Sequence, residues 1–111
     1  MPQTAGQALT RIIHHKHNAK QTECDGIKFP SKREAAYYQQ LKIRQAAGDV
    51  VFFLRQVPFH LPGGVRYVVD FVVFMADGTV RFVDVKGMKT PMYIAKKKMV
   101  EASFPITIEE V

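Results

Sequence analysis

The stretch RYVVDFVVFMADGTVRFVDVK (residues 66–86) decides the fold, because it encodes two apolar segments joined by a turn. Arg66–Met75 is apolar on both faces, which is typical of a covered central strand. Val80–Lys86 is predicted to form the second strand, and Ala76-Asp77-Gly78 between them is a hairpin loop with glycine at its last position. The sequence therefore predicts an antiparallel hairpin within a sheet.

Each of these strands carries an aspartate in an apolar frame, Asp70 in the first and Asp84 in the second. A buried carboxylate is costly unless it is paired or binds a metal ion. A three-residue loop with a left-handed Gly78 opposes Asp70 to Asp84, whereas a two-residue loop turns Asp84 to the other face. Since the three-residue loop is common and favours glycine at its last position, we expect two carboxylates on one face.

An amine completes this group, because Lys86 lies two residues beyond Asp84 and so on the same face. Two carboxylates can hold a hard divalent cation, which binds a phosphate and makes a water more acidic. The ammonium group can position that water or stabilise charge in the transition state, and the carbonyl of Val85 is a further candidate metal ligand. The alternative is a pair of structural acids that form salt bridges with Lys86 and with Arg66 or Arg81.

The segments before the hairpin predict a helix and a strand. Ser31 and Glu34 have the spacing of a capping box, and Gly48 supplies the left-handed end of the helix. Val50–Gln56 is rich enough in β-branched and aromatic residues for a strand, which Pro58 keeps from extending. Glu34 has two open interpretations, because a first-turn glutamate can serve the cap, reach a metal at the sheet end, or do both.

The segments after the hairpin predict a helix from Pro91 to about Ser103 and a short strand at Ile106-Thr107-Ile108. The apolar face of this helix is expected to contain Ile94, Met99, Val100 and Ala102, opposite the lysines at residues 96–98. The order α-β-β-β-α-β indicates an α/β (α+β) domain. We place this domain at residues 24–111, after a basic arm at residues 1–23 that contains His14, His15 and His17.

Composition excludes several classes of protein. The chain has 111 residues, enough for one domain, and its single cysteine rules out an internal disulfide and a cysteine-rich zinc site. It has no apolar run long enough for a membrane span and does not start like a secretory signal, so we expect a cytoplasmic protein without a membrane partner. Sixteen Lys and Arg against ten Asp and Glu give a net charge of +6, which favours nucleic acid as the partner. The alternative is a surplus of charge that only maintains solubility.

These residues resemble the PD-(D/E)xK nuclease superfamily. Asp70 and Asp84-Val85-Lys86 match its two signature elements, and Glu34 matches the acid often found on its first helix. The chain is most similar to Holliday-junction resolvase-like members and, at residues 22–35 and 84–91, to a family of small phage- and prophage-encoded endonuclease-like proteins. It departs from the signature at Val69, which replaces a proline, and in having aspartate rather than glutamate as the second acid. No role is assigned to Gln56.

The resemblance covers residues 18–111 and implies a restriction-endonuclease-like αβββαβ core, with a mixed central sheet flanked by two helices. It also implies cleavage of DNA that depends on Mg²⁺ or Mn²⁺, by a homodimer acting on branched DNA in a bacterial host cell. The implied metal ligands are Asp70, Asp84, Val85 and Glu34, and the implied catalytic residues are Asp70, Asp84, Lys86 and Glu34.

Basic residues around these acids are expected to contact the DNA backbone. They are Lys89, Lys96, Lys97 and Lys98 after the second strand, and Lys32 and Arg33 on the first helix. The alternative for the lysine run is the solvated face of an amphipathic helix. We therefore expect a structure-selective endonuclease that resolves Holliday-type junctions in phage recombination or DNA processing. Two alternatives are a non-catalytic DNA-binding or scaffold protein on the same fold, and a nickase of duplex or flap DNA.

Overall fold

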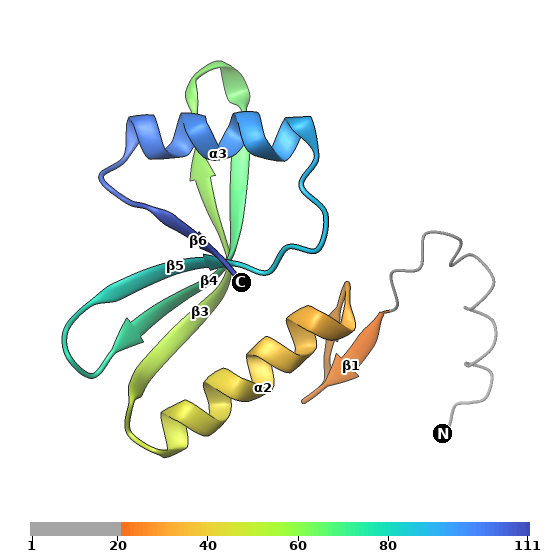
Figure 1. The fold of residues 1–111 in the computed structure, drawn as a ribbon, viewed down its shortest axis with the longest axis vertical. Helices are drawn as coiled ribbons and strands as arrows, with labels where there is room; N and C mark the ends of the chain where they lie inside the picture. The colour runs from red at the N-terminus through yellow and green to blue at the C-terminus, as the bar shows by residue number, and fades with distance from the viewer. Residues whose placement is uncertain (1–20) are drawn as a thin grey trace. The chain divides into compact units, whose positions relative to one another are not determined.

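The computed structural model describes residues 21–111 (Figure 1). The chain falls into two compact units that divide after Tyr38, within the helix Lys32–Ala46. The elements in chain order are β1 (Thr22–Cys24), β2 (Ile27–Phe29), α2 (Lys32–Ala46), β3 (Val50–His60), the 3-10 turn η2 (Pro62–Gly64), β4 (Arg66–Met75), β5 (Val80–Asp84), α3 (Pro91–Ser103) and β6 (Ile108–Glu110). The expected α-β-β-β-α-β order is confirmed, with a hairpin added in front of it. Neither helix in the described part of the chain has the length and apolar character that crossing a lipid bilayer requires.

The first unit contains the hairpin β1–β2 and the start of α2. Asp25 and Gly26 form the turn with φ of 54° and 76°, as a two-residue hairpin loop requires. Tyr38 on α2 donates a hydrogen bond to Asp25 Oδ2 at 2.8 Å. Ser31 Oγ accepts from the Glu34 N–H at 3.1 Å, which confirms the Ser31 side of the expected capping box. Strand β1 begins inside the segment that we expected to be an arm, and the predicted histidine cluster lies outside the described residues.

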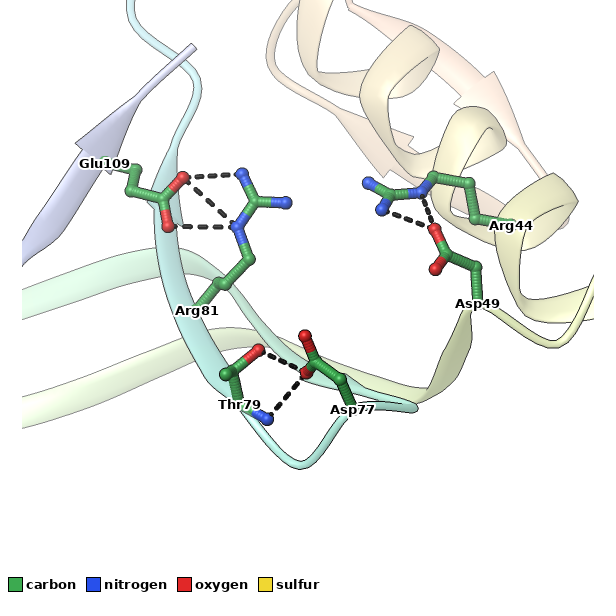
Figure 2. Close-up of polar contacts among 6 residues, drawn as sticks. All are labelled: Arg44, Asp49, Asp77, Thr79, Arg81 and Glu109. Atoms are coloured by element: carbon green, nitrogen blue, oxygen red, sulfur yellow. Dashed lines mark hydrogen bonds and ion pairs between the residues drawn. The ribbon is translucent and has the colours of Figure 1, made fainter.

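The end of α2 belongs to the second unit and is closed by Gly48. Its φ of 88° lets its N–H reach the Gln45 carbonyl at 3.1 Å, while the Asp49 N–H reaches the Arg44 carbonyl at 3.0 Å. These two bonds are those of a Schellman motif. The Arg44 guanidinium also pairs with the Asp49 carboxylate at 2.6 Å (Figure 2). Gly48 therefore ends the helix as expected.

The second unit is built on a four-stranded sheet in the order β3-β4-β5-β6. The first three strands are antiparallel, and β6 runs parallel to β5, so the sheet is mixed. Helix α3 packs against β4 (Figure 1). It contributes Tyr93 and Val100 to the core. The other buried members of this cluster are Leu61, Tyr67, Val69, Val72 and Ile108. Burial of this apolar surface fixes one face of the sheet.

The loop between β4 and β5 has the expected three residues. The Met75 N–H donates to the Thr79 carbonyl at 2.9 Å, and Gly78 has a φ of 93°. Asp77 Oδ1 accepts from the Thr79 N–H at 2.9 Å and from its hydroxyl (Figure 2). The ladder continues to the pair Phe71 and Val83, so the next opposed residues are Asp70 and Asp84. The expected register is confirmed.

Strand β3 is longer than the sequence predicts. It runs to His60, and Pro58 lies within it opposite Val68. The prediction was wrong because β3 is an edge strand, and a residue without an N–H is tolerated where no neighbouring strand needs that donor.

The last two strands also differ from the expected bounds. Strand β5 ends at Asp84 instead of Lys86, because the N–H groups of Val85 and Lys86 bond elsewhere, to Asp70 Oδ2 and the Val111 carbonyl. Strand β6 starts at Ile108, since the Ile106 N–H turns back to the Phe104 carbonyl after α3.

The buried face of α3 was predicted incorrectly. Its buried residues are Tyr93 and Val100, whereas Ile94 and Met99 are exposed. Lys96 and Lys97 are half-buried between Tyr93 and Val100 along the helix, so they flank the buried face instead of opposing it. Long lysine stems can cover apolar surface in this way while their ammonium groups reach polar partners.

We predict that Gly78→Ala lowers the free energy of unfolding by about 1–2 kcal/mol, because a Cβ is disfavoured at a left-handed backbone position. Chemical denaturation measures this loss. Gly87→Ala is the matched control, since Gly87 lacks a positive φ and a Cβ there has open space. A Gly78 variant as stable as the Gly87 variant would contradict the proposed loop geometry.

Candidate functional site

One polar residue from each strand forms a row across the sheet. Gln56 on β3 falls between two paired residues and so opposes Asp70 on β4. Asp70 in turn opposes Asp84 on β5, as the loop register requires. Asp84 pairs with Glu110 on β6. The parallel arrangement of β5 and β6 thus brings the last strand of the chain beside the predicted acids.

The two aspartates bond to each other's strands. The Asp70 N–H donates to Asp84 Oδ1 at 2.9 Å. The Val85 N–H donates to Asp70 Oδ2, also at 2.9 Å. Side-chain oxygens thus replace backbone carbonyls as acceptors, so the regular ladder between β4 and β5 stops here. The carboxylates are held by main chain, which gives them little freedom to rotate.

Asp84 is the more deeply placed of the two acids, with 1% of its surface exposed. Its Oδ2 accepts a hydrogen bond from the Tyr67 hydroxyl. Burial raises the pKa of Tyr67, and the bond to Asp84 raises it further, so the phenol remains a donor throughout the physiological pH range. Tyr67 therefore fixes the second oxygen of Asp84.

Asp70 is half-buried, and its Oδ1 accepts from Gln56 Nε2 at 3.3 Å. Burial raises the pKa of Asp70, and the charge of Asp84 adds to this effect. The Val85 N–H, the Lys86 ammonium and the Gln56 amide oppose it by favouring the charged form, without reversing the direction.

No ion pair involving Asp70 or Asp84 occurs within residues 21–111, although the alternative interpretation expected one. Arg81 instead pairs with Glu109, its Nε lying 2.9 Å from Oε2 (Figure 2). The two acids thus lie together without a basic side chain in direct contact. Such a pair of carboxylates attracts a cation.

Lys86 is held beside these acids by an aromatic ring. Its Nζ lies 4.5 Å from the ring centroid of Tyr93, within the range of a cation–π interaction. The rings of Tyr93 and Tyr67 are 6.3 Å apart, so Lys86 and Asp84 contact neighbouring tyrosines of one cluster. This arrangement agrees with the expected placement of Asp84 and Lys86 on one side of the sheet.

The predicted DNA-contacting lysines in the second unit have different surroundings. Lys89 Nζ lies 2.9 Å from Glu110 Oε1, and Lys97 Nζ lies 3.5 Å from Glu110 Oε2. Lys96 donates to the Arg66 carbonyl at 3.1 Å. Lys98 is exposed.

The remaining candidates belong to the first unit. Glu34 is buried there, and Lys32 and Arg33 are exposed. Their roles at the metal and on DNA stay predictions, as does the role of the Val85 carbonyl.

The donor set of Asp70 and Asp84 fits a hard divalent cation. A carboxylate oxygen that accepts one hydrogen bond keeps a second lone pair, and Asp70 faces solvent in part. Mg²⁺ typically takes one or two protein carboxylates and completes its shell with water and phosphate oxygens. No group of three His, Cys, Asp or Glu side chains suited to a metal occurs within residues 21–111.

Sequence reasoning missed Gln56, Tyr67, Tyr93 and Glu110. Gln56 could have been found by pairing β3 with β4 across the Pro62–Gly64 turn, had the first strand been extended through Pro58. Glu110 required the register of a parallel pair, which no local signal supplies. In the sequence, Tyr67 and Tyr93 cannot be distinguished from ordinary core residues.

The chain belongs to the DUF1064 family, described as "Protein of unknown function", whose model matches residues 14–109. No curated protein and no solved structure matches the chain.

We predict that, without metal, Asp70→Asn is more stable than the wild type and that this advantage grows as pH rises from about 4. A carboxyl whose pKa is raised by folding binds more proton in the folded state above its ordinary pKa of 3.8, so stability falls as pH rises. Urea denaturation in EDTA across pH 4–8 measures the difference. Asp77→Asn should show no such trend, because the bonds from Thr79 lower the pKa of Asp77. A pH-independent difference for Asp70→Asn would contradict this assignment.

Proposed function

We propose that this protein is a metal-dependent DNA endonuclease that hydrolyses phosphodiester bonds in branched, Holliday-type DNA. The observation that supports it most is the opposed pair of Asp70 and Asp84, held by main-chain hydrogen bonds without a basic ion-pair partner within residues 21–111. Lys86 supplies an ammonium group beside them. Maintaining two such acids side by side is costly for a structural role and useful for holding a cation.

Each residue of this site has a distinct proposed role. Asp70 and Asp84 hold Mg²⁺ or Mn²⁺, with the Val85 carbonyl as a further ligand. A cation bound there neutralises phosphate charge and makes a water more acidic. Lys86 places its ammonium group near the charge that develops on the phosphate, and the Tyr93 ring keeps it in place.

The proposed kind of DNA substrate is inferred from the charge of the protein and from its resemblance to known nucleases. A net charge of +6 suits contacts to the phosphate backbone, and Lys98 is exposed on the helix that follows the acidic strands. The preference for branched DNA, action as a homodimer, and a setting in the cytoplasm of a phage-infected bacterium follow from the similarity to resolvase-like nucleases.

We predict that the wild type cleaves a fluorescent four-way junction with Mg²⁺ or Mn²⁺, and that Asp84→Asn loses about a thousandfold in rate. Loss of a metal ligand removes several kcal/mol of transition-state stabilisation, and each 1.4 kcal/mol is tenfold. Asp77→Asn is the matched control, because it makes the same charge change at the far end of the same hairpin. Denaturing gels measure the cleavage rate.

Other outcomes of this assay separate the alternatives. Equal cleavage by the wild type and Asp84→Asn would show that the Asp84 carboxylate takes no part in the reaction. Binding of the junction without cleavage in either metal would favour a non-catalytic binder or scaffold protein. Faster cleavage of linear duplex or flap DNA than of the junction would favour a nickase.

We also predict that Mn²⁺ affinity rises with pH from about 4 to 7 in the absence of DNA. The raised pKa of Asp70 means that metal must displace a proton at the lower pH. Calorimetric titration at several pH values measures this dependence, and Asp70→Asn should bind more weakly and with less dependence on pH. Equal affinity across this range would contradict the shared-cation site.

A further inference from the structure

Three donors converge on the carboxylate of Glu110. Lys89 Nζ lies 2.9 Å from Oε1, and Lys97 Nζ lies 3.5 Å from Oε2. The Tyr93 hydroxyl donates to Oε2 at 2.8 Å. Two ammonium groups and a phenol are a donor set that suits a phosphate as well as it suits a carboxylate.

The two lysines outnumber the one glutamate in these contacts, while Asp84 on the neighbouring strand adds a second negative charge. The hydrogen bond from Lys89 is the main cause that lowers the pKa of Glu110 to about 2, so Glu110 remains ionised at neutral pH. The Lys86 Nζ also lies over the Tyr93 ring, 4.5 Å from the ring centroid. These ammonium groups therefore favour a phosphate over Glu110, most strongly when a cation neutralises Asp70 and Asp84.

The position of the cluster relates it to the proposed active site. Glu110 pairs directly with Asp84 across β5 and β6, and neighbouring strands lie about 4.8 Å apart. The donors around Glu110 are thus one strand away from the acids that hold the proposed cation. A DNA strand that reaches these acids passes close to Lys89 and Lys97.

Another anion can also take the place of the Glu110 carboxylate in these ion pairs. The Lys89 side chain is 51% exposed and the Glu110 side chain 23% exposed, so solvent screens their attraction. An ion pair that solvent reaches on the lysine side is weaker than a fully buried one. The contacts therefore cost little to break when a stronger anion arrives.

We propose that Lys89, Lys97 and the Tyr93 hydroxyl form a binding subsite for a DNA phosphate next to the one that is cleaved, and that Glu110 fills this subsite in the free protein. The identification of the phosphate as a neighbour of the cleaved one rests on the proposed function. In DNA-bound protein the phosphate replaces the Glu110 carboxylate as the acceptor. Glu110 thereby weakens binding and reduces the salt dependence of DNA affinity.

The test measures the affinity of the full chain for a fluorescent four-way junction by anisotropy, in EDTA and over a series of salt concentrations. Glu110→Gln should bind several-fold more tightly at low salt, with a log–log salt slope steeper by about 1, because lysines freed from the carboxylate neutralise a phosphate. The amide still accepts from Tyr93, so the fold is retained, and thermal denaturation checks this.

Glu109→Gln is the matched control. It makes the same change in net charge on the neighbouring residue, whose carboxylate pairs with Arg81 instead. The further substitutions Lys89→Ala and Lys97→Ala should abolish the gain of Glu110→Gln. By themselves they should weaken binding more than Lys98→Ala, which changes an exposed lysine on the same helix.

Two results would overturn the subsite. One is affinity of Glu110→Gln no higher than that of Glu109→Gln, including the case in which neither variant binds DNA. The other is a gain that persists without Lys89 and Lys97. Because EDTA prevents metal-dependent cleavage, the readout is independent of catalysis. A wild type that binds junctions and never cleaves them with Mg²⁺ or Mn²⁺ would refute the endonuclease and leave the subsite to be decided by these affinities.

Discussion

The rest of the site depends on one interaction, in which each of two carboxylates accepts a hydrogen bond from the main chain of the opposite strand. Asp84 accepts from the main chain of Asp70, and Asp70 accepts from the main chain of Val85. These bonds compensate for the burial of charge, and they also end the β4–β5 ladder. The end of the β4–β5 ladder and the orientation of both acids follow from these two hydrogen bonds.

The surroundings of the acids act on their charge in opposite directions. Burial and mutual repulsion raise the pKa of Asp70, whereas the donors and the ammonium group around it favour ionisation. Tyr67 and Tyr93 supply hydroxyl donors to Asp84 and Glu110 from one aromatic cluster. The result is a row of charged groups across the sheet in which, under the proposed function, a cation would compensate the aspartates and a phosphate would compensate the lysines.

Local sequence signals were sufficient to predict the central hairpin and the ends of the helices. Gly78 specifies a three-residue loop, and the loop alone places Asp70 opposite Asp84. Gly48 ends α2 and Thr90 caps α3 for similarly local reasons.

Features set by tertiary structure were not predictable in this way. The passage of β3 through Pro58 depends on its edge position, and the pairing of Glu110 with Asp84 depends on how a parallel strand docks. The sequence pointed to Lys89 and Lys97 as DNA contacts, but their ion pairs with Glu110 depend on where β6 docks and had no local signal. The direct test of the central claim is anomalous diffraction from a crystal soaked in Mn²⁺. The account predicts a peak within coordination distance of oxygens from both Asp70 and Asp84. Manganese bound elsewhere, with these two side chains still hydrogen-bonded and empty of metal, would contradict it.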